Sequence, residues 1–212
     1  MSINNIEAVD LGLSVKWASQ NIKSSSDISK DAFFSWGNIN EQLYYNRNNY
    51  PYLNKNIDNN GVLPLDKDVA VQRLGDKWRM PTITEWNELI NQCTWSETTK
   101  NGVKGYNVTG NGNTIFLPLS GLINDDDKAF ENEQGEYWTS ECVVNNTNNY
   151  TDAYGATLTP NSSPHYFISG SNERYIGHTV RPVYDETLTP STPNKPSSNN
   201  TNDGKKAKAV DL

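Results

Sequence analysis

Residues 80–93, MPTITEWNELINQC, constrain the fold most because they predict one well-defined amphipathic helix. Thr82 is a typical N-cap residue, and Glu85 follows three positions later, as in a capping box. The apolar residues then recur at steps of three and four positions, which places them on one helix face. These residues are Ile83, Trp86, Leu89, Ile90 and Cys93.

The first third of the chain predicts short elements separated by polar loops. Apolar and polar residues alternate within residues 8–20, which predicts a strand with one buried face. Phe33–Trp36 predicts a second short strand, followed by a long loop held by Tyr side chains. A helix is expected over 67–74, with Asp66 as its cap and Gly75 as its C-terminal stop.

The second half of the chain predicts strands and one hairpin. Residues 103–108 and 114–117 flank the turn segment Gly110–Asn113, which is rich in Gly and Asn. A further strand is expected at Tyr137–Ser140, then a long Asn/Thr/Ser loop region, and a last strand at Thr179–Tyr184.

Composition explains what would fill the core. Only 34% of the 212 residues are apolar, yet the chain holds 6 Trp, 11 Tyr and 5 Phe. Such a chain builds its core from a few large aromatic side chains and leaves much of its length in polar loops.

Charge and hydropathy exclude two classes of partner. Lys and Arg number 18 against 25 Asp and Glu, a formal net charge of −7 that would repel nucleic acid. No apolar run approaches the roughly 18 residues of a membrane span, and the first residues do not resemble a signal peptide. The chain is therefore either cytoplasmic or a domain of a longer exported protein with an added Met1.

The domain boundaries follow from a change of composition near the C-terminus. We expect one folded domain over 8–185, preceded by a disordered or artificially added segment at 1–7. Residues 186–208 are rich in Pro, Ser, Thr, Asn and Lys and predict a disordered linker. Residues 209–212, AVDL, repeat Ala8–Leu11, so we expect a second, similar domain to begin there.

Four segments in order resemble a known family. They are VDLGLSVKWAS (9–19), WRMPTITEWNEL (78–89), YWTS (137–140) and GHTVRPV (177–183). Together they resemble the Fibrobacter succinogenes major paralogous domain, a family of exported domains common in Bacteroidetes-type bacteria. The resemblance covers about 8–185 and implies a cell-surface or secreted protein.

The middle and last of these segments also look like parts of the formylglycine-generating-enzyme fold, a relative of C-type lectins. The similar patterns are its R-x-P-T-x-x-E-W helix and its final G-x-x-x-R strand. The resemblance implies an α+β, C-type-lectin-like fold, with two helices packed on small antiparallel sheets and long irregular loops.

Several residues of these motifs are interpreted as scaffold. Pro81 suits the first turn of a helix, where its missing N–H costs nothing. Glu85 is a plausible partner for Arg79 or Arg181, and such a pair would fix the helix against the last strand. The alternative for Arg181 is that it binds an anionic ligand. The tryptophans assigned to the core are Trp17, Trp86 and Trp138.

No catalytic motif emerges, so we expect no enzyme. A formylglycine-generating enzyme needs two neighbouring cysteines late in the chain, but only Cys142 lies there and Cys93 belongs to the helix. The two cysteines form either one disulfide or two separate buried thiols. His165 and His178 have no carboxylate at zinc-motif spacing.

Calcium is the one cofactor that the sequence suggests. A run of carboxylates offers the oxygen ligands that hard cations prefer, although such a run can equally be a solvated loop. The carboxylates proposed for calcium are Asp125, Asp126 and Asp127, with Glu131, Glu133 and Glu136 following.

The segment between Trp138 and Arg181 is the predicted ligand-binding region. Tyr gives rigid amphipathic area and Asn gives adaptable hydrogen bonding, but the Tyr residues could equally cover the core. The candidate contacts are Asn145, Asn146, Asn148, Asn149, Tyr150, Tyr154, His165, Tyr166, Arg174 and Tyr175.

The sequence favours a non-enzymatic recognition or adhesion domain that binds a glycan or protein ligand through these C-terminal loops. One alternative is a structural spacer in a tandem-domain surface protein, which predicts no pocket and few exposed aromatic residues between 145 and 175. Two others follow from the fold resemblance: a ligand-binding protein diversified by a retroelement, and a divergent enzyme of the formylglycine-generating type.

Overall fold

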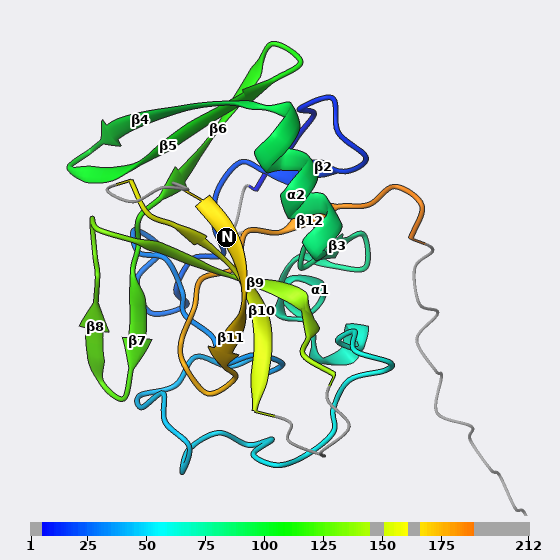
Figure 1. Cartoon of the computed structure of the whole chain (residues 1–212), viewed down its shortest axis with the longest axis vertical. Coiled ribbons are helices and arrows are strands. Elements are labelled where there is room, and N and C mark those ends of the chain that lie inside the picture. The colour runs from blue at the N-terminus through cyan, green and yellow to red at the C-terminus, as the bar shows by residue number, and fades with distance from the viewer. Residues whose placement is uncertain (1–5, 145–150, 161–165, 189–212) are drawn as a thin grey trace, which may run out of the picture.

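Figure 1 shows a computed structural model of the chain, which describes residues 6–144, 151–160 and 166–188. These residues form a mixed, mostly β structure with four small antiparallel sheets. They include the helices α1 (Val69–Leu74) and α2 (Ile83–Gln92). The expected combination of two helices with small antiparallel sheets is confirmed at this coarse level.

The four-stranded sheet brings the beginning, middle and end of the domain together. Its strands are β1 (Ala8–Val9), β2 (Lys16–Ala18), β12 (Val183–Tyr184) and β3 (Trp78–Arg79), paired in that order. The predicted strand within 8–20 is confirmed as this β1–β2 pair.

The last strand is shorter than the sequence predicts. Only Val183 and Tyr184 pair in β12, whereas Thr179 forms an isolated parallel bridge with Tyr137. The strand predicted at Phe33–Trp36 is also wrong, because the pairing there is limited to an isolated bridge between Phe34 and His178.

A second sheet consists of β4 (Thr94–Lys100), β5 (Val103–Gly110) and β6 (Asn113–Pro118). The predicted β5–β6 hairpin is confirmed, and its turn residues Asn111 and Gly112 have φ of 47° and 74°. Strand β4 was not predicted, and it joins β5 through a turn of the same Asn-Gly type.

The central sheet contradicts one expectation. Its strands are β9 (Gly135–Cys142), β10 (Asp152–Leu158) and β11 (Tyr166–Glu173), in the order β11-β10-β9. The strand expected at Tyr137–Ser140 is confirmed within β9. The prediction of a long loop after this strand is wrong for residues 152–158 and 166–173. These residues form the regular strands β10 and β11, and much of β10 is buried.

Two further elements complete the described architecture. The hairpin of β7 (Leu122–Asn124) and β8 (Asp127–Ala129) lies to the left of the central sheet in Figure 1, and α2 lies to the right. A 3-10 helix, η1 (Leu65–Lys67), precedes α1. Of the linker predicted over 186–208, residues 186–188 are described, and Glu186 pairs with Lys16 on β2 at 2.5 Å. Residues 189–208 and the repeated AVDL segment at 209–212 lie outside the described residues.

Helix α1 begins later than its sequence suggests. Its N-cap is Asp68, not Asp66, which belongs to η1. The buried Asp68 carboxylate accepts hydrogen bonds from the backbone N–H of Ala70 in the helix and of Met80 after β3. This tertiary contact selects Asp68 as the cap, whereas the predicted stop at Gly75 is confirmed, with φ of 100°.

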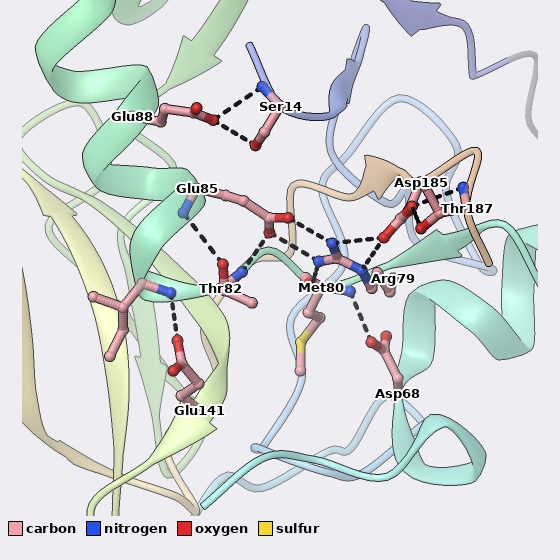
Figure 2. Close-up of polar contacts among 11 residues, drawn as sticks. Ser14, Asp68, Arg79, Met80, Thr82, Glu85, Glu88, Glu141, Asp185 and Thr187 are labelled. Atoms are coloured by element: carbon pink, nitrogen blue, oxygen red, sulfur yellow. Dashed lines mark hydrogen bonds and ion pairs between the residues drawn. The ribbon is translucent and has the colours of Figure 1, made fainter.

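Helix α2 begins at its predicted cap, Thr82, so Pro81 precedes the cap and does not lie in the first turn as expected. The Thr82 hydroxyl accepts from the backbone N–H of Glu85, and the Glu85 carboxylate accepts from the backbone N–H of Thr82, which completes the capping box. Glu141 on β9 accepts from the N–H of Ile83 and satisfies a further free donor of the first turn. Figure 2 shows these contacts at the start of the helix.

Arg79 connects α2 to the end of the domain, as Figure 2 shows. Its terminal nitrogens donate to the two carboxylate oxygens of Glu85 at 2.8 and 2.5 Å, and Nη2 also lies 3.0 Å from Asp185. Burial disfavours both charges, but the paired contacts outweigh it, so the pKa of Arg79 is raised and that of Glu85 is lowered. The expected Arg–Glu pair is therefore confirmed, with Arg79 as the partner.

The core is aromatic, as the composition predicts. Trp17, Trp86 and Tyr137 are fully buried in one cluster, where the Trp17 and Trp86 rings meet edge to face at 4.9 Å. A second cluster contains Trp36 and Trp138.

Substituting Arg79→Lys tests the contribution of the Arg79 contacts with Glu85 and Asp185 at the start of α2. A single ammonium keeps the charge but cannot donate two parallel hydrogen bonds to Glu85 while reaching Asp185, so we expect a loss of about 1–3 kcal/mol of unfolding free energy. Urea denaturation measures it. The control is Arg47→Lys at an exposed position, for which we expect a change within about 0.5 kcal/mol. Equal effects of the two substitutions would show that the paired geometry contributes nothing.

Candidate functional site

A pocket of about 760 Å³ with a mixed polar and apolar lining lies where four segments of the chain meet. Its walls come from residues 19–31, from the β4–β5 turn, from the end of β6 with the residues that follow, and from 128–131. Arg181, just before β12, completes it. The volume falls within the range of sites that hold small molecules, so we take this pocket as the candidate site.

The pocket is locally cationic in an acidic protein. Five basic side chains line it, against the two carboxylates of Asp31 and Glu131. The whole chain carries a formal net charge of −7. The basic residues are Lys23, Lys30, Lys100, Lys128 and Arg181.

Arg181 is the buried cation of this pocket, with 1% of its surface exposed. Nε donates to Asn21 Oδ1 at 2.7 Å, Nη1 to the Ala18 carbonyl at 2.8 Å, and Nη2 to the Phe116 carbonyl at 2.6 Å. All three acceptors are uncharged. Within the described part of the chain, no carboxylate lies within 4.0 Å of this guanidinium. Burial consequently lowers the pKa of Arg181, and Asp31 only partly opposes this shift.

Asp31 orders one wall of the pocket. Its carboxylate accepts from Lys23 Nζ at 2.7 Å, from Asn21 Nδ2 at 2.9 Å and from Ser120 Oγ at 2.6 Å. These bonds saturate most of its acceptor sites and offset the charge of Lys23. Because Asn21 also accepts from Arg181, the guanidinium and the carboxylate are held in one network.

The remaining lysines differ in how their charge is balanced. Lys128 pairs with Glu131 at 2.5 Å, and Lys30 pairs with Asp27 at 3.3 Å. Lys100 has no carboxylate within 4.0 Å among the described residues, and its Nζ lies 5.0 Å from the centroid of the Phe116 ring. The pocket therefore has two cations without a paired anion, Lys100 and Arg181.

The pocket lies apart from most residues that the sequence singled out for binding. Asn145, Asn146, Asn148, Asn149, Tyr150 and His165 lie outside the described residues. Tyr154 and Tyr166 lie on β10 and β11 and not on loops, so their predicted placement is wrong. Tyr166 also stacks on Trp95 at a centroid distance of 4.4 Å and packs against the core.

Arg174 is likewise not an exposed contact. It is 1% exposed, its guanidinium carbon lies 4.5 Å from the centroid of the Trp36 ring, and Nε donates to the Asp152 carbonyl at 3.2 Å. Nη2 is 3.8 Å from Asp58, too long for a hydrogen bond. Tyr175 is half-buried and donates to Glu173 at 2.5 Å. The Arg174 prediction mistook a buried structural side chain for a surface contact.

The predicted calcium site does not form a cluster. Asp125 and Asp126 make the turn of the β7–β8 hairpin, where Asp125 has φ of 59°, and Asp127 begins β8. Asp125 Oδ1 accepts from Asn46 Nδ2 at 2.7 Å. Within the described residues, no three His, Cys, Asp or Glu side chains come together to hold a metal ion, and calcium binding by these aspartates stays a prediction.

The two cysteines are separate thiols, so the disulfide alternative is wrong. Cys142 is buried on β9, and burial raises the pKa of its thiol to about 12. The thiol therefore stays protonated at neutral pH, which does not suit thiolate chemistry. His178 is also buried, stacks on Trp138 at 4.1 Å, and has its pKa lowered by burial to about 3, so it stays neutral.

The pocket residues were largely missed by sequence reasoning. The four lysines come from three segments that are distant in sequence and carry no shared motif. One pocket residue did stand out in the sequence. Arg181 in the GHTVRPV segment was interpreted as scaffold, with binding of an anionic ligand as the alternative.

Comparisons with protein-family models, with curated protein sequences and with solved structures found no match. In the described part of the chain, no helix is long and apolar enough to cross a membrane.

Thiol titration checks the environment of the cysteines. In denaturant without reductant, we expect both Cys93 and Cys142 to react with a disulfide reagent, because neither is oxidised. In the native protein Cys142 should react far more slowly than half-buried Cys93, since its thiol is buried and protonated. A Cys93→Ser variant isolates the Cys142 rate. Fast native labelling in that variant would contradict this description of the thiol.

Proposed function

We propose that this domain is a non-enzymatic recognition module of the C-type-lectin-like group that binds a saccharide in the pocket beside Arg181. The proposal also holds that it acts at the cell surface or as a secreted protein, as the resemblance implies. The observation that carries it is the pocket itself, because its volume of about 760 Å³ suits a small ligand and its lining combines amide, hydroxyl and charged side chains with apolar ones.

The chemistry of the lining favours a saccharide. Amide and hydroxyl side chains line the pocket and match the many hydroxyl groups of a sugar as donors and acceptors. The Phe116 side chain adds one aromatic surface to the wall. Asn21 and Ser120 are already fixed by Asp31 and Arg181, so part of the site is preorganised and loses little entropy on binding. The polar lining residues are Ser19, Gln20, Asn21, Ser29, Asn101 and Ser120.

This proposal moves the binding site away from the C-terminal loops. The described residues of that region include the strands β10 and β11, Arg174 is buried, and Tyr166 stacks on Trp95. A contact through Tyr154, Tyr175 or the residues outside the described ranges stays a prediction.

A structural spacer is the second candidate. It predicts no pocket, which the pocket beside Arg181 does not favour, and few exposed aromatic side chains between 145 and 175. Among the described residues of that range, Phe167, with 38% exposure, is the one large hydrophobic side chain that is exposed. A divergent enzyme receives less support, because the protonated thiol of Cys142 is a poor nucleophile and metal ligand.

A glycan array followed by calorimetric titration tests saccharide binding. The two Asn-Gly turns provide a matched pair of variants, because Asn101 and Asn111 both have positive φ, 52° and 47°, that glycine adopts readily. Asn101 lines the pocket and Asn111 does not. We expect Asn101→Gly to weaken binding about three- to tenfold, as for loss of one hydrogen bond, and Asn111→Gly to leave it unchanged.

Two outcomes would count against the proposal. A blank array, with and without calcium, would exclude saccharide binding and favour the spacer. Equal effects of the two turn variants would place the bound sugar away from this pocket.

A further inference from the structure

The pocket beside Arg181 has more positive charge than its own carboxylates balance. Asp31 and Glu131 offset Lys23 and Lys128, and Asp27 from outside the lining offsets Lys30. Arg181 and Lys100 are left without an anionic partner among the described residues.

The unbalanced charge of Arg181 is the more costly of the two. A buried cation that forms hydrogen bonds only with neutral groups keeps a large part of its desolvation penalty. An anion placed beside it would be attracted more strongly than in water, since the pocket is partly shielded from solvent.

Arg181 also retains donors for such an anion. A guanidinium has five N–H groups, and three of them are used for Asn21, Ala18 and Phe116. The two others belong to Nη1 and Nη2, one on each nitrogen.

From these observations, and resting on the proposed function, we propose that the pocket selects acidic saccharides and holds the carboxylate of a uronic-acid-type sugar between Arg181 and Lys100. The amide and hydroxyl groups of the lining then bind the hydroxyls of the same sugar unit. Asp31 and Glu131 limit the anionic charge that the pocket tolerates, which favours one carboxylate over a polyanion. The overall charge of −7 acts in the same direction.

Calorimetric titration with a glucuronate-containing oligosaccharide and with its methyl ester tests this selectivity. The two probes share every hydroxyl and differ at the carboxyl group, which is an anion in the acid and a neutral methyl ester in the other probe. We expect the ester to bind about 10- to 100-fold more weakly, as for loss of a charge-assisted hydrogen bond. Binding of the acid should weaken as ionic strength rises, while binding of the ester should not.

Lys100→Gln tests the rim cation without disturbing the buried network. We expect acid binding to weaken about two- to fivefold and ester binding to stay unchanged. The control is Lys55→Gln, which removes the same charge from an exposed lysine that does not line the pocket. Far-UV circular dichroism should be identical for both variants.

The outcomes separate the two proposals. Equal affinity for acid and ester, with binding still sensitive to Asn101→Gly, would overturn the selectivity and leave saccharide binding intact. Tighter binding of a sulfated analogue than of the uronate would overturn the assignment of a carboxylate. Absence of binding for every saccharide would overturn the proposed function itself.

Discussion

The buried guanidinium of Arg181 is the contact on which the arrangement of this domain depends. It joins Ala18 and Asn21 near the N-terminus to Phe116 on β6, from a position just before the last strand. Because its partners are carbonyl and amide oxygens, the contact fixes three distant segments without neutralising the charge. The side chain that links these segments therefore also leaves an uncompensated positive charge in the pocket that they form.

Arg79 makes an instructive contrast with Arg181. Its guanidinium is also largely buried, but it pairs with Glu85 and Asp185, so carboxylates of the same domain neutralise its charge. Arg174 is intermediate, with the ring of Trp36 beside it and Asp58 at 3.8 Å. Of these three arginines, Arg181 is the one that both lines the pocket and lacks a carboxylate within 4.0 Å.

Elements specified by neighbouring residues could be predicted from the sequence. The capping box of α2 and the Asn111-Gly112 turn follow from residues within a few positions of each other. Elements specified by distant contacts could not. Strand β10 contains Ala153, Gly155 and Ala156, whose small side chains let neighbouring strands approach but give no alternating pattern. The true cap of α1 likewise depends on Met80.

The candidate site illustrates the same limit. Tyrosine and arginine in a polar stretch suggested a binding surface, but Tyr166 and Arg174 cover or fill the interior, a role that composition alone does not distinguish. No sequence motif could reveal the pocket lysines, because Lys23 and Lys100 come to line the same pocket only in the folded chain.

Side-chain nitrogen NMR of Arg181 during titration with a uronate tests the central claim most directly. We expect its Nε and Nη resonances to shift and saturate with the affinity that calorimetry gives, while the Arg79 resonances stay constant. An Arg181 signal that does not move while the uronate binds would contradict the account, because the ligand would then lie away from the buried guanidinium that is proposed to hold its carboxylate.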